Sequence, residues 1–171
     1  MLKIKLQHTR FSLIIAFLVI SFGLTEALAA DCGGATACNC GDTVIASRTL
    51  STNWDCSGAQ THGLTVGADN MTINGGGHTL KGRQNLGKDK NNGINIVGYN
   101  NITVTNFSNI TDFDNGILIE NSNSNIISYN STNLNVYGIY LYSASSTLVT
   151  ENVANNNNGG ILIKSSTNNT I

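Results

Sequence analysis

A short glycine-led motif recurs through most of the chain and sets the strongest limit on its fold. Units of the form G-[IL]-x-[ILV] begin at Gly63, Gly93, Gly116, Gly138 and Gly160, and after a longer first interval their spacing is nearly constant. A period of about 22 residues is too short for repeats built from pairs of helices, and it lies in the range of solenoids built from β-strands. The units alternate with period two, and no segment shows the 3.6-residue spacing of a helix. The repeat therefore predicts an all-β solenoid.

The alternation places similar side chains at matching positions of successive turns. The first, third and eleventh residues after the glycine form three aliphatic columns. These columns read Ile94, Ile117, Ile139, Ile161; Ile96, Ile119, Leu141, Ile163; and Val104, Ile127, Val149, Ile171. One turn cannot bury its own apolar face, so we expect the turns to stack at the ~4.8 Å spacing of paired strands around a dry interior.

Glycine and asparagine suit the corners of such a solenoid. We expect the repeat glycine at a tight corner, where glycine can adopt a positive φ. Asparagine tolerates the left-handed region, and its amide can bond to the neighbouring turn. Asn130 and Asn152 both lie fourteen residues after their glycine, so we expect them to belong to one stacked ladder.

The first thirty residues are predicted to be a signal peptide. Lys3, Lys5 and Arg10 precede the apolar run FSLIIAFLVISFGL, and ALAAD offers a small-residue cleavage site. The run is shorter than the ~20 residues that a membrane span needs. Six basic and nine acidic residues remain after it, a balance that indicates neither nucleic-acid nor membrane binding. We therefore predict a secreted, periplasmic or cell-surface protein.

All four cysteines lie close together after this segment. In an oxidising compartment, an even and clustered set predicts two disulfides, and three connectivities exist. We favour Cys32–Cys38 with Cys40–Cys56, whose longer loop would contribute roughly 3 kcal/mol in the loop-entropy model. A metal site is disfavoured, because the spacing matches no pair of C-x2-C motifs. We predict that residues 31–62 form a Cys-rich cap and that residues 63–171 form the repeats.

Turns of the form GI-x-L…N-x-x…N resemble the right-handed parallel β-helix proteins, the pectate-lyase-like superfamily and its NosD-type members. The segment CGDTVIASRTLSTNWDCSG…GLTVGADNMTINGGGHTLKG is similar to the start of secreted β-helix repeat proteins. The resemblance covers Cys40 to Ile171 and implies a right-handed parallel β-helix. It does not by itself define a reaction.

The resemblance directs attention to the outer surface, where enzymes of this superfamily place their acidic residues. Asp112 and Asp114 are two residues apart, so we expect them to share a face. By our count the repeat places Asn135 and Tyr137, then Asn157 and Gly159, in the same columns. A paired-carboxylate mechanism therefore lacks its second carboxylate. We interpret both aspartates as turn residues, with calcium ligation as the functional alternative, and we predict no other cofactor.

Two other features suggest ligand binding. The extra residues of the long first interval carry four basic residues, Lys81, Arg83, Lys88 and Lys90. Such a loop would suit an acidic polysaccharide. The second residue after each glycine gives an outward column of Asn95, Leu118, Tyr140 and Leu162, with Tyr142 beside it. These tyrosines could stack on sugar rings, but a protein contact would explain them equally well.

Three functional hypotheses follow. We favour an exported, non-catalytic module that binds carbohydrate or serves as a surface structural element. The alternatives are a fragment of a polysaccharide lyase or glycoside hydrolase, and a NosD-like periplasmic accessory protein for copper delivery. The chain stops in mid-turn at Ile171, so we expect further turns, or self-association through the open C-terminal edge.

Overall fold

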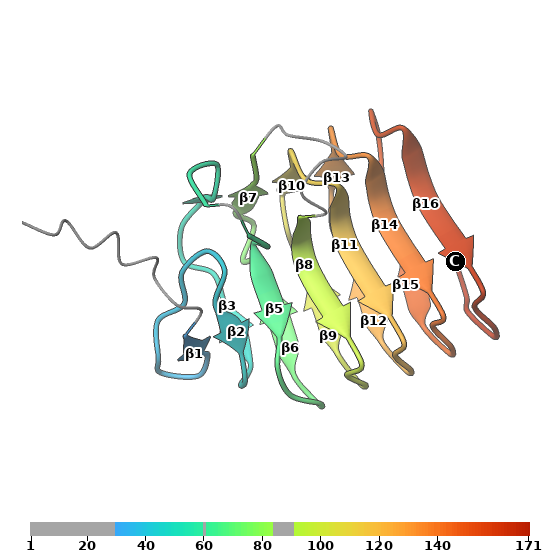
Figure 1. The fold of residues 1–171 in the computed structure, drawn as a ribbon, viewed down its shortest axis with the longest axis horizontal. Helices are drawn as coiled ribbons and strands as arrows, with labels where there is room; N and C mark the ends of the chain where they lie inside the picture. The colour runs from blue at the N-terminus through green and yellow to red at the C-terminus, as the bar shows by residue number, and fades with distance from the viewer. Residues whose placement is uncertain (1–29, 60, 84–90) are drawn as a thin grey trace, which may run out of the picture.

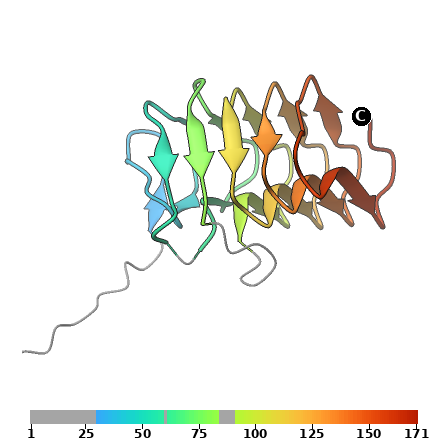
Figure 2. The same cartoon turned by 90° about the horizontal axis from the view of Figure 1, so that it is seen from above.

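The computed structural model describes residues 30–59, 61–83 and 91–171 of the chain. These residues form sixteen strands and no helix, and the strands lie in three parallel sheets (Figures 1 and 2). The seven-stranded sheet contains β1 (Asp31–Cys32), β2 (Thr43–Val44), β5 (Leu64–Val66), β8 (Asn92–Val97), β11 (Asn115–Glu120), β14 (Tyr137–Tyr142) and β16 (Gly159–Lys164). The five-stranded sheet contains β3 (Arg48–Thr49), β6 (Thr72–Asn74), β9 (Thr103–Thr105), β12 (Ile126–Ser128) and β15 (Leu148–Thr150). The four-stranded sheet contains β4 (Trp54–Asp55), β7 (Thr79–Lys81), β10 (Asn109–Thr111) and β13 (Thr132–Asn133).

From β2 onward the chain visits the three sheets in turn. Each inner strand therefore pairs with the strands of its own sheet one turn earlier and one turn later, always in parallel. Figure 1 shows the result in the seven-stranded sheet, whose strands lie side by side along the long axis of the molecule. The fold is an all-β parallel solenoid, as the repeat predicted.

The register confirms the predicted aliphatic columns. Ile94 pairs with Ile117, Ile117 with Ile139, and Ile139 with Ile161, so the spacing of the repeat glycines is also the register of the sheet. The column of Val104, Ile127 and Val149 is also in register. All of these side chains are buried except Ile161, which lies on the last strand, β16, and is 38% exposed.

The third side of the interior escaped the sequence analysis. Leu80, Ile110 and Thr132 are in register across the four-stranded sheet, and all three are fully buried. Phe107 and Phe113, on either side of β10, are among the largest fully buried side chains. The core therefore has three walls, one from each sheet, and aromatic rings at the corners of one turn.

The repeat glycines are required for a reason other than the one expected. None of the five has a positive φ. A Cβ at Gly116 would lie 2.6 Å from the carbonyl oxygen of Gly138, and a Cβ at Gly138 would lie 2.6 Å from that of Gly160. Because real Cβ atoms do not approach so closely, close packing between turns demands glycine here. Asparagine does occupy left-handed corners, as expected, for example at Asn101 and Asn121.

The predicted asparagine ladder is present and is one of several. Asn130 Oδ1 accepts the Phe107 N–H at 3.2 Å, and Asn152 Oδ1 accepts the Asn130 N–H at 2.9 Å. A second ladder runs through Phe113, Asn135 and Asn157 in the same way. These side-chain amides satisfy backbone groups at the corners, where strand pairing stops, so a buried corner leaves few polar groups unpaired.

The cysteines form the favoured pair of disulfides, Cys32–Cys38 and Cys40–Cys56. Cys32, Cys38 and Cys56 are buried and belong to the core cluster, against which Trp54 also packs. The Cys-rich segment supplies the first strand of each sheet, since β1, β3 and β4 are the outermost strands at this end. The predicted signal peptide lies almost entirely outside the described residues. Within the described part of the chain, no helix is long and apolar enough to span a membrane.

Candidate functional site: a tyrosine groove on the seven-stranded sheet

A groove of about 400 Å³ runs over the outer face of β8, β11 and β14. Its apolar lining comes from Leu118, Val136 and the rings of three tyrosines. Its polar lining comes from Asn92, Asp114, Asn115 and Glu120. A concave surface that combines aromatic rings with a few polar groups has the composition of a small-ligand site.

The three tyrosines follow β14 along its length. The ring centroids of Tyr137 and Tyr140 are 5.6 Å apart, and those of Tyr140 and Tyr142 are 6.1 Å apart, with the rings tilted by 48° and 42°. All three rings are partly exposed. The structure therefore brings the two predicted tyrosines, Tyr140 and Tyr142, together and adds Tyr137 to the row.

Leu118 is less exposed than its outward direction suggested. It pairs with Asn95 on one side and Tyr140 on the other, as the predicted outward column requires. Its side chain is only 8% exposed, although it lines the groove. An outward direction therefore does not make this side chain exposed, because Leu118 is almost covered on the outer face of the sheet.

A chain of side-chain amides lies beside the rings. Asn115 Nδ2 donates to Asn92 Oδ1 at 2.7 Å, and Asn92 Nδ2 donates to Asn95 Oδ1 at 2.8 Å. The backbone N–H of Asn92 donates to His62 Nδ1 at 3.0 Å, so the other ring nitrogen of neutral His62 carries the proton. Burial lowers the pKa of His62, which keeps the imidazole neutral and able to accept this bond. The amide chain holds one side of the groove in a fixed position.

Charged residues flank the last of the three rings. Glu120 on β11, Tyr142 on β14 and Lys164 on β16 are in register across the sheet. The ammonium of Lys164 lies 5.7 Å from the centroid of the Tyr142 ring, within the range of a cation–π contact. The ring at this end of the groove therefore has Glu120 on the adjacent strand β11 and the ammonium of Lys164, from β16, over it.

Asp112 and Asp114 occupy different environments. Asp112 is 5% exposed at a left-handed corner, with φ 65°. Asp114 lines the groove, and its Oδ2 accepts the Asn91 N–H at 3.1 Å.

Calcium takes six to eight oxygen ligands. In the described ranges, no group of three or more His, Cys, Asp and Glu residues is placed to hold a metal ion. Calcium binding stays a prediction.

The predicted neighbours of these aspartates were displaced by one residue. Asn115 pairs with Tyr137, and the Asp112 N–H donates to the carbonyl oxygen of Leu134. The residues beside Asp112 and Asp114 in the next turn are therefore Leu134 and Val136, and not Asn135 and Tyr137. The register advances by 22 residues from β11 to β14, one fewer than from β8 to β11. Neither neighbour is a carboxylate.

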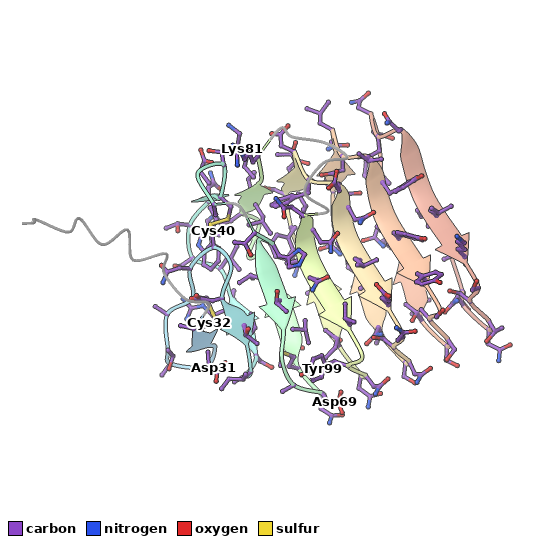
Figure 3. The ribbon with its side chains drawn as sticks, in the orientation of Figure 1. Asp31, Cys32, Cys40, Asp69, Lys81 and Tyr99 are labelled. Atoms are coloured by element: carbon purple, nitrogen blue, oxygen red, sulfur yellow. A yellow bond between two sulfur atoms is a disulfide. The ribbon has the colours of Figure 1, made fainter. Side chains whose placement is uncertain are left out.

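The basic residues are only partly described. Lys81 and Arg83 are exposed, while Lys88 and Lys90 lie outside the described residues. Lys81 ends β7 in the four-stranded sheet, at the opposite edge of the molecule from Asp69 and Tyr99 (Figure 3). Neither Lys81 nor Arg83 is among the residues that line the tyrosine groove.

Comparison with known proteins identifies the class of protein to which this parallel solenoid belongs. Residues 39–171 match the family described as "Periplasmic copper-binding protein (NosD)". The chain therefore belongs to the NosD family of β-helix repeat proteins. Searches of curated proteins and of solved structures give no match.

The described residues do not fit a copper site. Copper is held by imidazole, thiolate or thioether groups. All four cysteines are in disulfides, and Met71 is 4% exposed within the core. His62 already uses Nδ1 to accept the Asn92 N–H, and it joins no group of potential ligands in the ranges that the structure describes.

Proposed function

We propose that the protein is an exported, non-catalytic β-helix module that binds carbohydrate in the tyrosine groove. The observation that carries this proposal is the row of Tyr137, Tyr140 and Tyr142 along one groove. A sugar ring has an apolar face of C–H groups, which packs against an aromatic ring, and hydroxyl groups at its edge, which need polar partners. The groove offers both.

The position of the rings suits an extended glycan. They are spaced at 5.6 and 6.1 Å along a single strand, so a chain of sugars lying along β14 would meet one ring after another. The β-sheet beneath fixes the backbone of all three tyrosines, so little conformational entropy is lost from the protein backbone on binding. Leu118 adds an apolar side chain to the lining of the same groove.

The groove favours an uncharged glycan. The charged residues among its lining are Asp114 and Glu120, and carboxylates repel the uronates of an acidic polysaccharide. The acidic polysaccharide expected from the sequence would instead depend on the basic residues, of which Lys81 and Arg83 lie outside the groove lining. The experiment that tests the proposal therefore includes acidic polysaccharides beside neutral ones.

Membership of the NosD family and the predicted signal peptide support export to the periplasm. The family description also names copper. We do not propose a copper role for the described residues, because their thiols are in disulfides and their histidines are not grouped.

Affinity electrophoresis of the exported protein tests the proposal. Gels would contain a neutral polysaccharide, such as hydroxyethylcellulose or glucomannan, or an acidic one, such as polygalacturonate or alginate. We expect the neutral gels to retard the protein, and Tyr140→Ala and Tyr142→Ala to lose the retardation. Tyr129→Ala is the matched control, because Tyr129 is 62% exposed but follows β12 in the five-stranded sheet.

Three outcomes would contradict or replace the proposed function. Equal retardation of Tyr140→Ala and the unmodified protein would contradict a role for the groove. Retardation only by acidic gels, lost at high salt and in Lys81→Gln with Arg83→Gln, would move binding to the basic residues. Release of an unsaturated uronate, followed by absorbance, would replace a binding module by a lyase.

A further inference from the structure

We propose that Glu120 and Lys164 form the two edges of a sugar subsite on Tyr142 and select a glycan whose ring hydroxyls are equatorial, as in a glucan. This inference rests on the proposed function, and it names residues and a substrate class that the tyrosine row alone does not define. It follows from three side chains on three adjacent strands, in one column of the seven-stranded sheet.

The register fixes the geometry. Glu120 pairs with Tyr142, and Tyr142 pairs with Lys164. Two strand spacings therefore separate the backbone of Glu120 from that of Lys164, about 10 Å in all. Tyr142 lies between them in the column, so a sugar ring stacked on Tyr142 would have Glu120 on the side of β11 and Lys164 on the side of β16.

The chemistry of the column matches that ring. Glu120 only accepts hydrogen bonds and Lys164 only donates them, whereas a hydroxyl group does both. A sugar stacked on Tyr142 can thus donate to the carboxylate at one edge and accept from the ammonium at the other. Hydrogen bonds to charged groups are stronger than neutral ones, so these two contacts would add affinity as well as orientation.

The stereochemistry of the sugar then matters. Equatorial hydroxyls project from the rim of the ring, in the direction of Glu120 and Lys164. An axial hydroxyl projects from a face, where it either meets the Tyr142 ring or points away from both charged groups. A mannan or galactan unit therefore loses one contact that a glucan unit makes.

The Lys164 side chain is free to adjust to such a ligand. It is exposed, and its ammonium is 5.7 Å from the Tyr142 centroid, near the outer limit of cation–π contact. Lysine has a flexible four-carbon stem, so the ammonium can move from the ring to a hydroxyl as a sugar enters. Before a sugar binds, the contact with Tyr142 holds the ammonium near the subsite.

Titration calorimetry with cellohexaose and mannohexaose tests the inference on the exported protein. We expect tighter binding of cellohexaose by about tenfold, the value of one hydrogen bond to a charged group. Glu120→Gln and Lys164→Gln should each weaken cellohexaose binding about tenfold. Each should also reduce the ratio of the affinity for cellohexaose to the affinity for mannohexaose. Glu151→Gln is the control, since Glu151 is an exposed carboxylate at a corner after β15.

The outcomes separate this inference from the proposed function. If Tyr140→Ala loses binding while Glu120→Gln and Lys164→Gln retain both affinity and preference, the groove binds glycans but these edges do not select them. If the unmodified protein prefers mannohexaose, the assignment of equatorial hydroxyls is wrong. If it binds neither oligosaccharide nor any polysaccharide gel, the proposed function itself fails.

Discussion

Replacing Asn130 by alanine should destabilise the solenoid far more than an asparagine on a surface would. Asn130 is 2% exposed, its Oδ1 accepts the Phe107 N–H, and its Nδ2 donates to Val104 O at 3.0 Å and to Asn152 Oδ1 at 3.1 Å. Truncation leaves a buried N–H without its acceptor, at about 1–3 kcal/mol, and removes two further bonds of about 1 kcal/mol or less each. We therefore expect a total loss of roughly 2–4 kcal/mol.

Urea unfolding followed by circular dichroism measures this loss. With an m-value of about 2 kcal/mol/M, the midpoint should fall by about 1–2 M. Asn158→Ala provides the control, because Asn158 is exposed in the next turn and should change stability by no more than about 0.5 kcal/mol. Asn152→Ala should be less than additive with Asn130→Ala, since the two side chains share a hydrogen bond. Equal midpoints for Asn130→Ala and Asn158→Ala would refute the view that the ladder holds the corner.

Three further predictions concern other parts of the fold. Gly116→Ala should destabilise the protein by several kcal/mol, since its Cβ would meet the Gly138 carbonyl oxygen at 2.6 Å; a thermal midpoint close to that of the unmodified protein would contradict this. Protonation of His62 breaks its bond to Asn92, and its lowered pKa means that the unfolded chain binds the proton first. Stability should therefore fall as the pH drops below about 6.5, and His62→Asn, which keeps an acceptor but does not titrate, should lose less across that range. Thiol titration of the folded protein should find no free cysteine, and copper or zinc should leave its melting temperature unchanged; two or more reactive thiols would favour a metal site.

The aliphatic interior could be predicted because stacking repeats it in every turn. A column such as Ile94, Ile117 and Ile139 recurs at nearly constant intervals, and the register follows those intervals. The four-stranded sheet could not be predicted in the same way. Its strands are two or three residues long, and its inner column changes from Leu80 to Ile110 to Thr132, so no single residue type marks it.

Two features of the structure that the sequence did not reveal have the same physical origin, namely contacts between turns that a linear pattern does not contain. Glycine at the repeat position suggested a positive φ, but the constraint is the carbonyl oxygen of the next turn. Leu118 was correctly placed on the outer face, but its burial depends on how neighbouring side chains lie over it. Alternation defines direction, and only the packed structure defines exposure.

The residue types in the outer columns support the tyrosine groove as a ligand site. Stacking favours similar residues in adjacent turns, and the inner columns next to β14 remain Ile or Leu throughout. The three outward columns do not follow this rule. They read Asn115, Tyr137, Gly159; Leu118, Tyr140, Leu162; and Glu120, Tyr142, Lys164. In each of them the aromatic residue falls on β14 and on neither neighbouring strand. The interior gives no reason for three tyrosines to coincide on one strand, since none of them packs into it. A ligand that lies along that strand and needs successive aromatic rings does give a reason, and it is the reason we propose.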